Sequence, residues 1–142
     1  MKVVINKCHG GFGLSDDAVI RYLELQGKEV WIMGDYFKTY SLVPPEERID
    51  FGNKKGFGPD NWHEMSMEEK ANWNETYNKQ TFYARDLERN DPLLIQVVEE
   101  LRKGADGDHA ELKIVEIPDD VEWQIDEYDG LEWVAEKHRT WS

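Results

Sequence analysis

Three glycines lie close together at the point where a predicted strand meets a predicted helix. The strand covers Lys2–Asn6, and Ser15 is the expected N-cap of the helix. Glycine lets backbone N–H groups crowd around one point, and a helix N-terminus adds partial positive charge there. Such a loop can hold an anion or a nucleotide. The ligand contacts predicted from it are Lys7, His9, Gly10, Gly11 and Gly13.

The same loop also fits a purely structural role. Its Gly-Gly-Phe-Gly pattern is neither a dinucleotide fingerprint nor a P-loop, and no lysine follows it into the helix. Asp16 and Asp17 occupy the first turn, where a phosphate would meet two carboxylates and a ribose or base would fit better. The structural alternative is a tight turn in which Phe12 and Leu14 pack against the core.

A second candidate group combines arginines with aromatic rings. Guanidinium groups bind phosphates in a forked geometry, and rings stack on bases, so this segment and the glycine loop would form a nucleotide pocket if they converge. Alternatively, the arginines pair with neighbouring carboxylates and the rings pack internally. The predicted ligand contacts from this part of the chain are Phe82, Tyr83, Arg85 and Arg89, with Arg139 near the C-terminal end as a further wall.

The residues that could catalyse a reaction do not form a recognisable set. Cys8 and His9 are adjacent, and adjacent residues leaving a strand point to opposite sides. The four histidines have no metal-ligand spacing, and no nucleophile, base and oxyanion donors can be assembled. The sequence therefore favours a non-catalytic protein with no cofactor and no metal.

The composition is strongly acidic. The chain has 142 residues with 30 acidic and 17 basic side chains, giving a net charge of −13. Such a field repels nucleic acid and suits a basic protein partner or a DNA mimic. The single cysteine excludes an internal disulfide, and no apolar run could span a membrane. We therefore expect a cytoplasmic protein, and the high aromatic content is compatible with a homodimer.

Apolar periodicity and turn residues predict an α+β fold. We expect a mixed, mostly antiparallel sheet of about five strands, with two main helices on one face. The chain is predicted to be a single domain, 1–142, in which 34–90 forms an insertion or flap. Besides the first strand, the predicted elements are a helix from Ser15 to Gly27, a strand Glu29–Met33, a helix Met67–Lys79, a helix from Asp91 to Leu101, a strand Glu111–Ile117, and a hairpin of Val121–Glu127 with Leu131–Glu136.

The register of that hairpin decides which acidic side chains share a face. A three-residue turn, Tyr128–Gly130, places Ile125 opposite Trp133 and Trp123 opposite Ala135. It also pairs like charges on the outer face, which is tolerated in solvent or balanced by a basic partner or a divalent ion. The acidic protein-facing surface predicted in this way is Glu122, Asp126, Glu132 and Glu136.

Both ends of the chain resemble a widespread group of small phage and prophage proteins. The resemblance rests on the opening KVVINKCHGGFGLS, the ending EIPDDVEWQIDEYDGLEWVAEKHRTW, the FYARD segment and the DPL…EL segment. It covers about two thirds of the chain and implies a phage accessory protein in a bacterial cytoplasm, but no catalytic residues. With this setting, we expect a protein that binds a small nucleotide-type ligand and sequesters a host defence signal. The alternative is an acidic inhibitor or DNA mimic that blocks a basic host protein.

Overall fold

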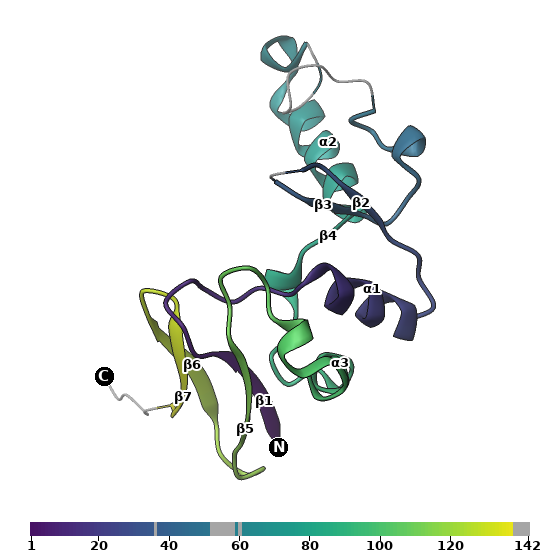
Figure 1. Cartoon of the computed structure of the whole chain (residues 1–142). Coiled ribbons are helices and arrows are strands. Elements are labelled where there is room, and N and C mark those ends of the chain that lie inside the picture. The colour runs from purple at the N-terminus through teal and green to yellow at the C-terminus, as the bar shows by residue number, and fades with distance from the viewer. Residues whose placement is uncertain (36, 52–58, 60, 138–142) are drawn as a thin grey trace, which may run out of the picture. The chain divides into compact units, whose positions relative to one another are not determined.

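The chain folds into two compact units. The computed structural model describes residues 1–35, 37–51, 59 and 61–137 (Figure 1). Unit 1 comprises Met1–Gly27 and Ala84–Ser142, and unit 2 is the continuous segment Lys28–Tyr83, which covers most of the region predicted as an insertion. All strand pairings within the described residues are antiparallel, in sheets of two, three and two strands. The predicted α+β class is confirmed, with the strands distributed over three sheets.

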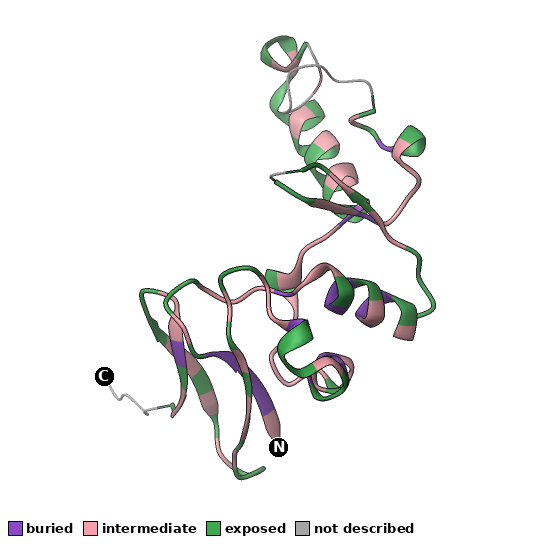
Figure 2. Cartoon of the chain, viewed as in Figure 1, coloured by how far each residue is buried: buried purple, intermediate pink, exposed green. Residues whose placement is uncertain are grey.

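Unit 1 packs helix α3 against a short sheet and helix α1 against α3. Helices α1 and α3 contact each other, and α3 lies against the antiparallel pair β1–β5 (Figure 1). Its elements are β1 (Lys2–Asn6), α1 (Asp16–Leu25), the 3-10 turns η3 (Ala84–Asp86) and η4 (Arg102–Ala105), α3 (Pro92–Leu101), β5 (Leu112–Glu116), β6 (Trp123–Tyr128) and β7 (Leu131–Glu136). Among the residues that the structure describes, the fully buried apolar ones all come from this unit, and include Val3, Val4, Val19, Leu23, Leu94 and Val97 (Figure 2).

The helix ends follow the sequence signals. The Ser15 side chain accepts a hydrogen bond from the backbone N–H of Ala18, as an N-cap should. The Asp91 side chain accepts from the N–H of Leu93, and a proline occupies the first position of α3. Gly27 has φ +74° just beyond α1, a left-handed conformation that favours glycine. The two helix starts and the end of α1 were therefore predictable from single residues.

The β6–β7 hairpin departs from the predicted register by one residue. Tyr128 pairs with Leu131, so only Asp129 and Gly130 form the turn, with φ of 49° and 88°. Two positive φ values in an Asp-Gly pair are typical of a type I′ turn, whose twist matches that of the strands. The predicted three-residue turn is therefore wrong, and so are the pairings built on it.

The shift moves residues to opposite faces of the hairpin, since side chains alternate along a strand. Asp126 lies opposite Trp133, and Glu127 lies opposite Glu132. We call the two faces outer and inner. The outer face carries Gln124, Asp126, Tyr128, Leu131, Trp133 and Ala135, whereas the inner face carries Trp123, Ile125, Glu127, Glu132, Val134 and Glu136.

Unit 2 is a three-stranded sheet with one helix. The sheet order is β2–β3–β4, and α2 begins with the predicted capping box between Ser66 and Glu69. The elements are β2 (Trp31–Met33), β3 (Thr39–Ser41), the 3-10 turns η1 (Pro45–Glu47) and η2 (Trp62–Glu64), α2 (Met67–Lys79) and β4 (Thr81–Phe82). The strand predicted at Glu29–Met33 thus belongs to this sheet and not to the sheet of β1. No α2 residue is buried (Figure 2).

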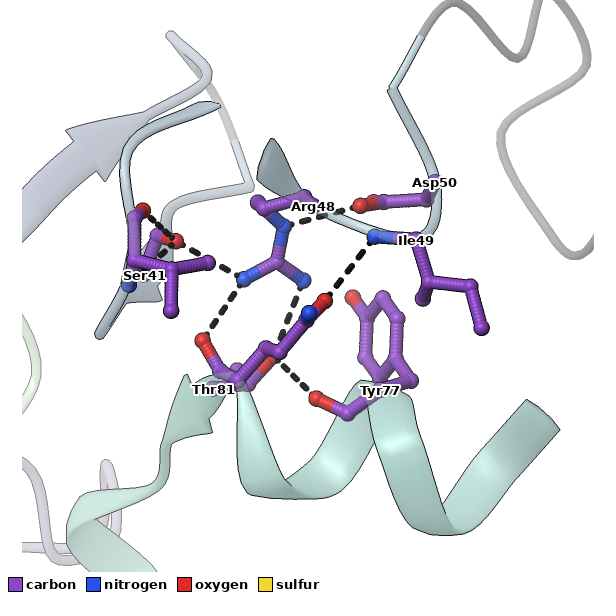
Figure 3. A network of polar contacts seen from close by, with 8 residues as sticks. Ser41, Arg48, Ile49, Asp50, Tyr77 and Thr81 are labelled. Atoms are coloured by element: carbon purple, nitrogen blue, oxygen red, sulfur yellow. Dashed lines mark hydrogen bonds and ion pairs between the residues drawn. The ribbon is translucent and has the colours of Figure 1, made fainter. Parts of the chain in front are cut away.

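A buried arginine forms the centre of unit 2. Among the described residues of this unit, only Ser41, Arg48 and Thr81 are buried, and all three are polar. Arg48 Nη1 donates to Ser41 Oγ at 3.0 Å and to the Gln80 carbonyl at 2.8 Å (Figure 3). Its Nη2 donates to Thr81 Oγ1 at 2.9 Å. The side chain therefore connects β3 with the end of α2 and the start of β4.

The charge of Arg48 is compensated by two neighbours. Nε donates to Asp50 Oδ1 at 2.8 Å, and the guanidinium lies 5.0 Å from the centre of the Tyr77 ring (Figure 3). An isolated buried charge would cost several kcal/mol, so the ion pair with Asp50, with the nearby ring of Tyr77, is needed to accommodate the arginine.

Replacing Arg48→Lys should destabilise unit 2 by about 3 kcal/mol, because an ammonium group has only three donors and no planar fork. Hydrogen exchange of the α2 amides measures the loss. Lys79→Ala is the matched control, since the exposed Lys79–Glu75 pair at 3.1 Å contributes only about 0.3 to 0.5 kcal/mol. Equal effects of the two substitutions would show that the Arg48 network is not the centre of the unit.

Candidate functional site

The glycine-rich loop lies against two other loops of unit 1. A Cβ atom at Gly10 would overlap the carbonyl of His109, and one at Gly130 would lie 2.6 Å from the carbonyl oxygen of His9. The Gly13 carbonyl accepts a hydrogen bond from Gly107 N at 3.0 Å. Three backbone segments thus meet where side chains would not fit. This close approach accounts for Gly10 without a ligand, and a left-handed φ of +92° accounts for Gly11.

Asn6, at the end of β1, holds these segments together. Its Nδ2 donates to the carbonyls of Cys8 at 2.7 Å and Gly130 at 2.8 Å, and its Oδ1 accepts from the N–H of Glu111 at 2.8 Å. The residue is completely buried, and its backbone N–H donates to Glu132 Oε1 at 2.8 Å. A single amide side chain therefore fixes the loop, the hairpin turn and the start of β5.

Arg89 and Glu132 form a forked ion pair beside β1. The two terminal nitrogens of Arg89 donate to the two oxygens of Glu132 at 2.6 and 2.9 Å. The guanidinium also lies 3.6 Å from the centre of the Phe12 ring, inside the glycine-rich loop. The predicted convergence of Arg89 with that loop is therefore present, but a carboxylate of the chain itself occupies the fork.

This pair closes the open edge of β1. Met1 exchanges backbone hydrogen bonds with Ile117, and Lys7 N donates to the Glu111 carbonyl. The alternate residues Val4 and Asn6 therefore point to the other edge of β1. Val4 N donates to the Arg89 carbonyl at 2.7 Å, and Asn6 N donates to Glu132. Backbone and side-chain groups thus take the place of a neighbouring strand.

Glu132 does not belong to an exposed acidic surface. It was predicted on the solvated outer face, but it is 5% exposed on the inner face and paired with Arg89. The one-residue register shift is the physical reason, because it turns Glu132 and Glu136 away from the face of Asp126. Glu122 and Glu136 are both exposed.

The remaining predicted ligand residues are spread over the chain. Lys7 and His9 are exposed beside the loop, and Arg85 is exposed in η3. Phe82 and Tyr83 belong to unit 2 and are half-buried. Arg139 lies outside the described residues.

Sequence reasoning missed the aromatic character of the outer face of the hairpin. Tyr128 is 72% exposed and Trp133 is 43% exposed, and the two lie diagonally on neighbouring strands. Asp126, directly opposite Trp133, accepts a hydrogen bond from Gln124 at 2.8 Å. An Asp-Gly pair at the turn was the signal that would have given this register.

The sequence around this face is uniformly acidic. Residues 118–136 contain no lysine or arginine, and their eight acidic residues are Asp119, Asp120, Glu122, Asp126, Glu127, Asp129, Glu132 and Glu136. Only Glu132 among them is buried. Exposed rings within a strongly negative segment are suited to binding cations and basic surfaces.

Comparison of the chain with family models, with curated proteins and with solved structures finds no match. Within the described ranges, no group of three histidine, cysteine or acidic side chains could hold a metal ion. In the same part of the chain, no helix has the length and apolar character needed to cross a bilayer.

Replacing Glu132→Gln should destabilise the protein by about 3 kcal/mol, because it leaves the charge of Arg89 without its carboxylate partner beside the core. Urea unfolding measures the change. Glu127→Gln is a matched control, since Glu127 lies directly opposite on the same face but is exposed, and we expect a change within about 0.5 kcal/mol. If both variants were equally stable, Glu132 would behave as a solvated surface residue after all.

Proposed function

We propose that this protein is a non-catalytic binding protein that holds a basic protein partner on the outer face of the β6–β7 hairpin. The observation that carries the proposal is the exposed pair Tyr128 and Trp133 in a segment without lysine or arginine. Tyrosine and tryptophan are enriched in protein interfaces and dominate their binding energy. The surrounding carboxylates would complement a basic surface and orient it during approach.

The overall charge supports a partner of this kind. A net charge of −13 attracts basic proteins and repels nucleic acid. A basic protein held on this face would lose access to its acidic ligands, so binding would also block it. The phage resemblance of the two chain ends provides the setting, in which the partner is a host protein in the bacterial cytoplasm.

The small nucleotide-type ligand stays a prediction. Close backbone packing accounts for Gly10 and a left-handed φ accounts for Gly11, while Glu132 and Phe12 engage the guanidinium of Arg89. No contact among the described residues specifically favours a nucleotide over a basic protein. A thermal-shift screen with linear and cyclic nucleotides tests the ligand directly.

Affinity capture tests the proposed function. The full chain, immobilised at about 150 mM salt, should retain from a bacterial lysate at least one protein with a pI above about 9. The variant Glu122→Lys/Asp126→Lys should lose that protein, because the added cations repel a basic surface and leave the Arg89–Glu132 pair intact.

The matched control is Glu46→Lys/Glu47→Lys, which reverses two exposed charges in η1 of unit 2. It alters the net charge equally and should retain the partner. Retention by the hairpin variant, or equal loss in both variants, would rule out a specific acidic docking face.

A further inference from the structure

The chain binds two of its own arginines in the same three-part arrangement. Arg89 pairs with the carboxylate of Glu132 and lies 3.6 Å from the centre of the Phe12 ring. Arg48 pairs with the carboxylate of Asp50 and lies 5.0 Å from the centre of the Tyr77 ring (Figure 3). In both places the guanidinium donates to a carboxylate and lies over an aromatic ring.

The outer face of the hairpin presents the same components without an arginine. Asp126 and Trp133 are directly opposite, and Tyr128 lies on the same face two residues from Asp126. Among the described residues, no lysine or arginine pairs with Asp126 or lies over either ring. Among the described side chains, Asp126 is hydrogen-bonded only to the amide of Gln124. Both rings are substantially exposed, so a side chain from another molecule can reach them.

We propose that this face binds an arginine side chain of the basic partner, with Asp126 at the edge of the guanidinium and Tyr128 and Trp133 at its faces. The inference rests on the proposed function and names the residue type that the partner must supply. Diagonal neighbours on adjacent strands lie about 7 to 8 Å apart. A planar cation held between two rings, each at the 3.6 Å seen for Arg89 over Phe12, needs about the same spacing.

Arginine fits this arrangement better than lysine for two physical reasons. The guanidinium is planar and weakly hydrated, so it stacks on a ring at low desolvation cost, whereas an ammonium group is compact and strongly hydrated. The guanidinium also offers donors in its plane while its faces are covered, which allows the carboxylate and both rings to act together. Because the outer face is open to solvent, an ion pair with Asp126 alone would contribute little to the binding free energy.

The experiment compares two capped peptides of equal length and charge, one containing arginine and one lysine, titrated into the full chain. Binding is followed by the NMR signal of the Trp133 indole N–H, which is assigned from the spectrum of Trp133→Phe. We expect the arginine peptide to bind at least about threefold more tightly than the lysine peptide. Tyr128→Leu and Asp126→Asn should each weaken the arginine peptide by about threefold to tenfold and remove the preference over lysine.

Phe51→Leu is the matched control, because it removes another exposed ring, in unit 2, and should leave arginine binding unchanged. Melting curves of all variants check that the fold is retained. Equal binding of the two peptides, or arginine binding that survives Tyr128→Leu, would overturn the arginine site. If the basic protein were still captured through Glu122 and Asp126, the proposed function would stand without the arginine site. If the wild-type chain neither captured a basic protein nor bound the peptides, the proposed function and the arginine site would both be overturned.

Discussion

The free edge of β1 is closed by an ion pair instead of another strand, and the arrangement of unit 1 depends on this. Arg89 provides its carbonyl to Val4, and Glu132 provides a carboxylate oxygen to Asn6, so these two edge amides are satisfied without a ladder. Because Glu132 belongs to β7, the same pair attaches the hairpin to β1 and fixes which hairpin face is turned outward. The exposure of Tyr128 and Trp133 follows from that orientation.

The two small units differ in the kind of residue that they bury. Unit 1 buries aliphatic side chains between two helices and a sheet, whereas the buried described residues of unit 2 are two hydroxyl residues and an arginine. Each unit nevertheless holds one guanidinium between a carboxylate and a ring. An unpaired guanidinium would be strongly destabilising in such a place, so these contacts specify the local structure as well as stabilise it.

Close packing at Gly10 and a left-handed φ at Gly11 explain two glycines of a loop that has the composition of a ligand site. Glycines around a helix start indicate backbone crowding, and the sequence does not reveal whether a ligand or another loop fills the space. Here the loops carrying Gly107 and Gly130 approach it, and Asn6 bonds across all three segments. We therefore place the candidate binding surface on the β6–β7 hairpin, where rings and carboxylates remain accessible.

The sequence by itself determined the local structure: the caps at Ser15, Ser66 and Asp91, the stripe of α3, the strand β1 and the α+β class. These depend on hydrogen bonds and periodicity within a few residues. Only the tertiary structure decided the distant partners of the two arginines. The Gln80 carbonyl is 32 residues from Arg48 in the sequence, and the Glu132 carboxylate is 43 residues from Arg89. It also decided the face on which each acidic residue of the hairpin lies, because a shift of one residue in pairing turns every side chain over.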